Sequence, residues 1–428
     1  MIQGFSGGLL NRELIYQTDL PSFQRDFASL KTLDHGTGPN ITFTRASNAT
    51  YFDADGVLQT ASNNVPRFDH DSANGNSLGL LIEEARTNSI RNSQAGGAGA
   101  GTLSTNWTAT PTTNNVTRTI VGGGTEGGMS YLEIKYAGTP TATASVTIGF
   151  DTTTQVVAAN GQTWSGSLYC RLVDGSLSNA TVALLTSGRD VSGNSVAGQA
   201  TNTTITPTSS ALITQRFSSV VAFSNASVER VMVFLTISYT NGDPIDLTLR
   251  IAAPQLEQGA FATSYIPTTS AAATRAADSA VVTPISSFYN QAEGTLFAEW
   301  VSGVSAASRA IVDLNNSSIT ERLGITTTAS SIPSAIGRNA GSIFDITIGT
   351  AISSGAITKM AVGLATDNYQ AARDGSLGTA DTSGAMPSIA VLRFGNNSSG
   401  TVTLNGHLRK VAYWPRRLSN TLLQQLTT

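Results

Sequence analysis

The stretch FTRASNATYFDADGVLQTASNNVPRFDHDSANGNSLGLLIEEARTN, from Phe43 to Asn88, sets the pattern for the whole chain. Its aromatic and β-branched residues come in short runs, and the pairs Asp55-Gly56 and Asn74-Gly75 separate these runs. Short runs divided by Asp-Gly and Asn-Gly are typical of antiparallel hairpins. The stretch therefore predicts a β-meander.

Composition extends this prediction to the rest of the chain. Charged residues make up 12% and hydrophobic residues 40% of the 428 residues, whereas about 25% charged is typical of soluble proteins. Thr and Val suit half-buried strands, and the abundant Gly, Asn and Ser suit turns. We therefore expect an all-β protein with a neutral polar surface.

The charge and hydropathy patterns exclude two classes of function. The net charge is −3 and no basic stripe occurs, so the sequence lacks the electrostatic basis for nucleic-acid binding. No apolar run approaches the roughly 20 residues that span a bilayer, so no membrane insertion is expected. The N-terminal MIQGFSGGLLNREL does not resemble a signal peptide.

Two stretches of small residues divide the chain. Residues 94–102 read QAGGAGAGT, and residues 268–286 begin TTSAAATRAADSAVVTP. Small residues offer little to pack, so both stretches predict linkers. The expected parts are an N-terminal attachment and oligomerisation region over 1–93, a second unit over 103–267, and a third over 287–428.

The second and third units read as β-sandwiches. Runs such as MSYLEIKYAG at 129–138 and DLTLRIAAPQLE at 246–257 predict short strands. Runs such as RAIVDLN at 309–315 and ITKMAVGLA at 357–365 predict the same in the third unit. The ending RRLSNTLLQQL predicts a short helix capped by Ser419.

Three linked motifs carry a family resemblance. FTRAS-x-ATY-x-D-x-x-G, PRFDHD and GLLIEEARTN, in this order, resemble a module near the N-terminus of tail-fibre-like virion proteins of bacteriophages. The second unit, with Asn106-Trp107 and the ending IAAPQLEQGAFATSYIPT, resembles a carbohydrate-binding-module-type jelly roll. The third, with Asp374-Gly375, VLRFG and LNGHLRKVAYWP, resembles a laminin-G or concanavalin-like lectin domain.

A metal site is not predicted. The histidines His35, His70 and His407 are far apart, and none forms a ligand-spaced pair. The aspartates before the two Gly turns superficially match oxygen-rich calcium loops, but they lack further ligands at fixed spacing and a distal bidentate Glu. We expect these four residues, Asp53, Asp55, Asp69 and Asp71, to stabilise the turns.

Catalytic residues are not predicted either. Glu83 and Glu84 are adjacent, so on a strand they point to opposite faces and cannot flank one bond. We expect one of them to pair with Arg67 or Arg86. The chain has no Gly-x-Ser-x-Gly elbow, and Cys170 lies in an apolar run that indicates a buried thiol. GGGTEGG at 122–128 reads as a loop without a phosphate-binding Lys.

Sugar binding would draw on aromatic side chains, because sugars present apolar faces that stack on rings. The candidates are Trp107, Tyr131, Tyr136, Trp164, Tyr169 and Tyr239 in the second unit, and Trp300, Tyr369 and Trp414 in the third. Most strand aromatics pack in cores, and at least one of Trp164 and Tyr169 is expected there. No residue is assigned to carbohydrate binding.

Taken together, the residues and the resemblance predict a bacteriophage virion structural protein of the fibre or collar type. It would attach to bacterial surface polysaccharide, contact other virion proteins of the tail, neck or capsid, and form a homo-oligomer, by resemblance a trimer. It would be assembled in the host cytoplasm, located in the virion, use no cofactor and not be an enzyme. The alternatives are a decoration or collar protein without a ligand, and a polysaccharide depolymerase tailspike, whose usual β-helix would show periodic repeats.

Overall fold

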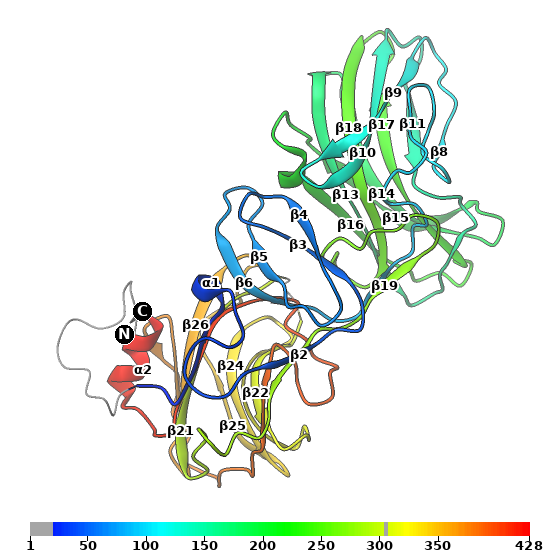
Figure 1. The fold of residues 1–428 in the computed structure, drawn as a ribbon. Coiled ribbons are helices and arrows are strands. Elements are labelled where there is room, and N and C mark those ends of the chain that lie inside the picture. Colours follow the sequence, from blue (N-terminus) through cyan, green and yellow to red (C-terminus); the bar gives the residue numbers. More distant parts are fainter. Residues whose placement is uncertain (1–19, 304–306) are drawn as a thin grey trace.

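Two β-sandwiches account for nearly all of the regular structure (Figure 1). The computed structural model describes residues 20–303 and 307–428. The jelly-roll sandwich takes its strands from residues 108–258, and the C-terminal sandwich takes strands from both ends of the chain. The predicted all-β class with two sandwiches is confirmed.

The jelly-roll sandwich faces two antiparallel sheets against each other. Within the described residues, one sheet has five strands in the order β16-β13-β18-β10-β9, and the other has six, β15-β14-β17-β11-β8 with β12 beside β17. The bounds are Thr108–Ala109 for β8, Thr117–Glu126 for β9, Met129–Gly138 for β10, Ala144–Gly149 for β11, Val156–Val157 for β12, Thr163–Ser176 for β13, Ala180–Arg189 for β14, Ser195–Ile205 for β15, Arg216–Ala222 for β16, Arg230–Tyr239 for β17 and Ile245–Gln258 for β18.

The alternation of inward-facing apolar and outward-facing polar residues explains why these segments form strands. In β10, Leu132, Ile134 and Tyr136 point into the core and are each 0% exposed, as the period of two requires. One expectation is wrong: residues 122–126 of the glycine-rich run do not form a loop but complete β9, which pairs with β10.

The C-terminal sandwich also has two sheets. Within the described residues, one has eight strands, β28-β27-β26-β21-β30-β6-β5 with β1 beside β30, and the other has seven, β2-β20-β29-β22-β23-β24-β25. The bounds are Phe23–Asp26 for β1, Thr42–Thr44 for β2, Phe68–His70 for β5, Ser77–Ile82 for β6, Ser279–Val282 for β20, Glu293–Val301 for β21, Arg309–Asn315 for β22, Glu321–Thr327 for β23, Pro333–Asn339 for β24, Ser342–Thr347 for β25, Ile357–Ala365 for β26, Gln370–Arg373 for β27, Ser376–Leu377 for β28, Val391–Phe394 for β29 and Gly406–Trp414 for β30.

The pairing of these strands crosses the boundary expected at residue 93. Strands β1, β5 and β6 join the sheet of β30, and β2 pairs with β20. Phe23, Phe43 and Leu80 are buried in the core of the C-terminal sandwich. Strands of three to six residues are marginal alone, and here they bury their apolar faces only within a larger sheet. The rest of the expected division stays a prediction.

Both expected linkers are built into the structure. In 94–102, Ala95 is buried in the jelly-roll core, and the Gly101 amide donates to the Ile120 carbonyl at 2.9 Å. Residues 268–286 contain β20, whose Ala280 and Val282 are buried in the other core. In both stretches the small residues allow close packing, and their composition does not indicate a flexible tether here.

Two small sheets lie at the junction between the sandwiches. Strands β3 (Ala49–Phe52) and β4 (Leu58–Ala61) form a hairpin that lies between the sandwiches in Figure 1. Its Phe52 and Leu58 pack on an outer cluster of the jelly-roll sandwich that contains Tyr169. Strand β7 (Arg86–Asn88) pairs with β19 (Ala273–Arg275).

The helices are short. The predicted C-terminal helix is α2 (Asn420–Thr427), and Ser419 caps it by accepting from the Leu422 amide, as expected. Its Leu423 packs against Phe297 and Trp414 on the outside of the C-terminal sandwich. The described residues also form α1 (Phe27–Leu30) and a 3₁₀ turn, η2 (Leu212–Thr214). No helix in the described part of the chain is long and apolar enough to cross a membrane.

Candidate functional site

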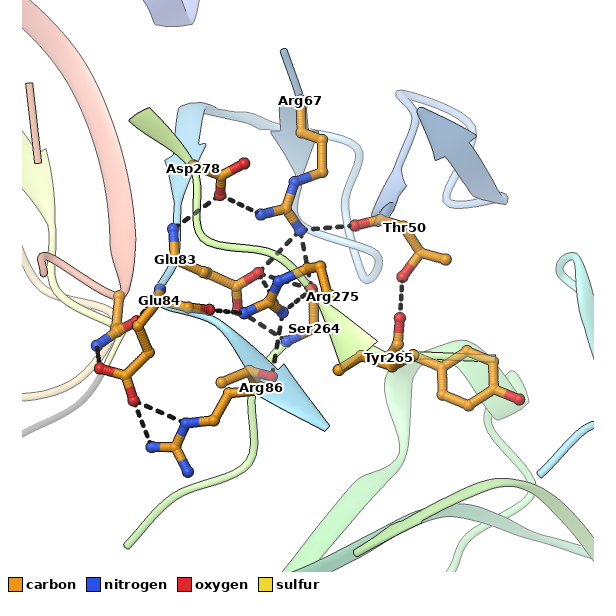
Figure 2. Close-up of polar contacts among 12 residues, drawn as sticks. Thr50, Arg67, Glu83, Glu84, Arg86, Ser264, Tyr265, Arg275 and Asp278 are labelled. Carbon is orange, nitrogen blue, oxygen red and sulfur yellow. Dashed lines mark hydrogen bonds and ion pairs between the residues drawn. The ribbon is translucent and has the colours of Figure 1, made fainter. Parts of the chain in front are cut away.

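Charged side chains meet in the interior at the junction of the two sandwiches. We call Arg45, Arg67, Glu83, Arg275 and Asp278 the junction cluster; four of them are labelled in Figure 2. All five belong to segments that flank short strands, and each is at most 5% exposed. Arg67 precedes β5, Glu83 follows β6, and Arg275 ends β19. The registers of these strands therefore set the cluster.

Asp278 holds two of the arginines. Its Oδ1 lies 3.1 Å from Arg45 Nη1, and its Oδ2 lies 2.6 Å from Arg67 Nη2. The Glu83 amide also donates to Oδ2 at 2.9 Å. One carboxylate from the segment between β19 and β20 thus connects two parts of the N-terminal meander.

Glu83 connects the sandwiches. Its Oε2 lies 2.8 Å from Arg67 Nη1 and 2.9 Å from Arg275 Nη1. Ser264, which follows the last jelly-roll strand, donates from its amide and its hydroxyl to the same carboxylate at 2.8 and 2.6 Å. Burial alone would raise the pKa of Glu83, but Arg275, Arg67 and the Ser264 donors together hold it well below its ordinary value of 4.5.

The junction cluster therefore acts as a structural clamp. Every oxygen of Glu83 and Asp278 already accepts a hydrogen bond. A carboxylate with a strongly lowered pKa does not carry a proton near neutral pH, so Glu83 is not suited to general acid catalysis. Removing one partner of a buried ion pair costs about 3–5 kcal/mol, which makes the clamp sensitive to substitution.

The two adjacent glutamates separate as predicted. Glu83 pairs with Arg67 inside, whereas Glu84 points the other way and lies 2.6 Å from Arg86 (Figure 2). Glu84 also accepts from Asn405 Nδ2 at 3.0 Å. The expected pairing with Arg67 or Arg86 is thus confirmed for both residues.

Two of the four aspartates, Asp53 and Asp71, stabilise turns as predicted, whereas Asp55 takes part through its backbone amide. Asp53 accepts from the Asp55 and Val57 amides, and Asp71 accepts from the Ala73 amide. Asp69 instead accepts from the Phe52 amide at 2.7 Å and lies 2.8 Å from His407 Nε2. Asp69 therefore joins the hairpin to β30.

Metal ligands do not gather in the structure. Among the residues described, no group of three or more His, Cys, Asp and Glu is placed to hold a metal ion. Cys170 is 0% exposed in the jelly-roll core, and burial raises the pKa of its thiol. The expected burial of this thiol is thus confirmed.

The aromatic candidates for sugar stacking are mostly inaccessible. Eight are at most 5% exposed: Trp107, Tyr136, Trp164, Tyr169, Tyr239, Trp300, Tyr369 and Trp414. Trp164 belongs to the core of the jelly-roll sandwich, as expected for at least one of Trp164 and Tyr169. The ninth, Tyr131, is half-buried, and the Arg250 guanidinium lies 4.0 Å from its ring centre. Eight of the nine rings therefore present little surface for stacking, although Trp164 and Tyr169 each line a cavity.

Several cavities flank the junction instead. The first, which we call the junction groove, has a volume of about 610 Å³ and lies along β7 and the start of β13. Carboxylate, guanidinium, amide and hydroxyl groups line it: Glu84, Arg86, Thr87, Ser89, Gln162, Thr163, Gln258 and Thr274. The volume falls within the roughly 300–1,000 Å³ of ligand sites, which also favour domain interfaces.

The second cavity, which we call the junction pocket, is smaller at about 180 Å³. Hairpin, jelly-roll and β30 residues line it, including Tyr51, Asp69, Arg216, Phe261 and His407. Phe261 lies in the segment between the two cavities, and the guanidinium of Arg86 lies 4.6 Å from its ring centre. Arg309 approaches the same ring at 5.3 Å.

Sequence reasoning missed most of these residues. Arg45, Arg275 and Asp278 lie in motifs quoted for resemblance or as a linker, and Ser264 lies in the jelly-roll ending. Nothing local marks Arg216 or Phe261, because their partners are distant in sequence. The signal available was an Arg and an Asp in the otherwise small-residue stretch 268–286.

Comparison with protein-family models and with curated protein sequences gives no match. Solved structures are similar at low level. A carbohydrate-binding module, CBM40, of the Ruminococcus gnavus IT-sialidase bound to α2,3-sialyllactose shares 13% identity over 32% of this chain and 84% of its own, with a TM-score of 0.29. Domains LG4-5 of the mouse laminin α1 chain share 9% over 62% and 88%, with a TM-score of 0.23.

A sialidase of Trypanosoma rangeli shares 10% identity over 90% of this chain and 77% of its own, with a TM-score of 0.29. The expectation that this chain is not an enzyme is therefore corrected, because proteins with similar structures include enzymes. At these identities and TM-scores the similarity assigns no reaction to the chain.

Proposed function

We propose that this chain is a fibre- or collar-type appendage subunit of a bacteriophage virion, and that it attaches to bacterial surface polysaccharide at the junction of its sandwiches. The junction groove is the observation that carries the attachment role. It is open, about 610 Å³ in volume, and lined by neutral hydrogen-bonding groups beside one ion pair, together with Ala85 and Trp164. Such a surface suits a hydroxyl-rich polymer.

The virion assignment rests on the resemblance of the Phe43–Asn88 motifs. Several residues of these motifs, Arg45, Arg67 and Glu83, build the junction cluster. The resemblance is thus carried by residues that hold the two sandwiches together. A rigid two-sandwich unit suits a particle appendage, in which many copies compensate for weak binding at each site.

The remaining expectations belong to this proposal. The subunit forms a homo-oligomer, by resemblance a trimer, contacts tail, neck or capsid proteins, and is located in the virion after assembly in the host cytoplasm. Immunogold labelling of purified particles with antibody against this chain tests the location. Particles without label contradict it.

Binding of the purified full chain to a polysaccharide array from bacterial surfaces tests the attachment role. Thr274 is exposed on the wall of the groove, so Thr274→Trp fills the groove from outside. We expect Thr274→Trp to weaken binding at least tenfold. Thr347→Trp, on the exposed face of β25 away from the groove, is the matched control and keeps binding unchanged.

Absence of binding to every surface polysaccharide contradicts attachment and favours a decoration or collar protein without a ligand. Equal loss of polysaccharide binding in Thr274→Trp and Thr347→Trp contradicts the assignment of the binding site to the junction groove. The release of reducing ends from a bound polysaccharide would show the depolymerase alternative. The usual β-helix of such depolymerases is not formed by the described residues, because their paired strands form antiparallel sheets.

A further inference from the structure

Among the described residues that line the junction pocket, Arg216 is a cation without an ion pair. Arg216 begins β16 and is half-buried, with its guanidinium 5.6 Å from the ring centre of Tyr169. Its Nη2 donates to the Ser167 hydroxyl at 3.1 Å, and its Nε is buried without a partner. Within the described part of the chain, no carboxylate forms an ion pair with it.

The two carboxylates that line the pocket, Asp69 and Glu83, already accept hydrogen bonds. Asp69 is held by His407 Nε2 at 2.8 Å and by the Phe52 amide at 2.7 Å. Glu83 is held by Arg67, Arg275 and Ser264. Of the described residues that line the pocket, Arg216 is therefore the cation that an incoming anion meets without displacing an ion-pair partner. A guanidinium presents a planar fork of donors that matches a carboxylate.

The walls of the pocket are aromatic. Tyr51 and Phe52 come from the hairpin, and Phe261 comes from the segment after β18. All three are half-buried, so part of each ring remains accessible. Rings beside one fixed polar group are the usual lining of a small-molecule site. A sugar ring presents apolar C–H faces to such walls, whereas a free inorganic anion does not use them.

We propose that the junction pocket binds the acidic sugar residue of a polysaccharide, with the sugar carboxylate on Arg216 and its ring between the aromatic walls. This rests on the polysaccharide attachment proposed above and names the sugar class. With about 180 Å³, the pocket is smaller than the ~300–1,000 Å³ of sites for larger ligands. It therefore admits one ring or its charged end.

An NMR titration of the full chain, labelled with ¹⁵N-arginine, tests the proposal. The probes are the trimers of glucuronate, galacturonate and mannuronate, each compared with its neutral methyl ester. The Nε–Hε resonance of Arg216 is assigned by its absence in Arg216→Lys. We expect a saturable shift of this resonance with at least one acidic trimer, and at least tenfold weaker binding of its ester.

Two variants of Arg216 distinguish the role of its positive charge from the role of its planar guanidinium. Arg216→Gln is expected to weaken binding of that acidic trimer at least tenfold, and Arg216→Lys about threefold, because lysine keeps the charge but loses the fork. Arg230 is half-buried on β17 of the opposite sheet, so Arg230→Gln is the matched control and binds as the parent. Tyr51→Ala tests the aromatic wall of the pocket independently. It is expected to weaken binding of the acidic trimer and of its methyl ester to the same extent.

The proposal is overturned if none of the three acidic trimers binds, if ester and acid bind equally, or if Arg216→Gln binds as the parent while its thermal transition is unchanged. A shift produced equally by inorganic phosphate would show a general anion site without a sugar and would also overturn it. The two proposals can fail separately. If the chain still binds polysaccharide and Thr274→Trp abolishes that binding, but no acidic trimer binds at Arg216, only the inference about the junction pocket is contradicted.

Discussion

Ser264 donates from both its amide and its hydroxyl to the carboxylate of Glu83, although the two residues are 181 positions apart. Ser264 lies just beyond the jelly-roll sandwich, and Glu83 lies at the end of β6 in the C-terminal sandwich. The contact is completed by Arg67 and Arg275 on the same carboxylate. The two sandwiches are therefore joined through a buried charge and not only by a covalent connection.

Glu83→Gln is expected to destabilise the protein by about 3–5 kcal/mol, because it leaves two buried guanidiniums short of a partner. The measurement is the urea midpoint followed by circular dichroism. Glu84→Gln is the control, since Glu84 forms a pair that is partly open to solvent, and such pairs contribute about 0–1 kcal/mol. Similar decreases in unfolding free energy for both variants would show that the junction cluster stabilises the protein no more than a partly exposed ion pair does.

The lowered pKa of Glu83 predicts acid sensitivity. Because its folded-state pKa lies below the ordinary 4.5, the unfolded chain binds more protons as the pH falls through and below that value. Its contribution is complete above pH 4.5 and is lost progressively at lower pH. Urea midpoints measured from pH 7 to pH 3 should fall more steeply for the parent than for Glu83→Gln. Parallel curves would contradict this.

Asp313 predicts the opposite dependence. It is 0% exposed on β22, and burial raises its pKa from 3.8 to about 6 although Arg322 lies 2.7 Å away. The folded state then binds the extra proton, so stability falls as the pH rises from about 4 to about 6, by up to about 3 kcal/mol.

Asp313→Asn removes this titration and should flatten the stability curve between pH 4 and 6, whatever its effect on absolute stability. The check is the difference in unfolding free energy between those two pH values for each protein. A difference as large in the variant as in the parent would assign the slope to other groups.

Gly259 and Gly161 offer a matched pair on the junction groove. Both have positive φ, +144° and +81°, but a Cβ at Gly259 would collide with the Arg86 guanidinium, whereas a Cβ at Gly161 meets nothing within 4 Å. Gly161→Ala should cost about 1–2 kcal/mol from backbone strain alone. Gly259→Ala should cost more in thermal unfolding and should also weaken polysaccharide binding, because Arg86 must move. Equal costs would show that Arg86 adapts freely.

The resemblance and the local sequence patterns predicted where the strands lie, but they did not predict which strands pair with one another. Runs such as Met129–Gly138 and Arg309–Asn315 became strands with the expected bounds, because alternation and turn residues act locally. The Phe43–Asn88 meander was expected to stand apart, yet its strands complete the C-terminal sandwich. Which edge a short strand joins depends on the apolar surface that distant strands leave uncovered.

By itself, the sequence determined the all-β class, the two sandwiches, the capped C-terminal helix and the opposite directions of Glu83 and Glu84. These follow from periodicity, turn chemistry and capping, which involve neighbouring residues. Only the tertiary structure decided that Arg45, Arg67, Glu83, Arg275 and Asp278 meet in one buried cluster. It also decided that no carboxylate of residues 20–303 and 307–428 forms an ion pair with Arg216. Charge pairing over such separations depends on the packing of whole sheets, and nothing in the local pattern records it.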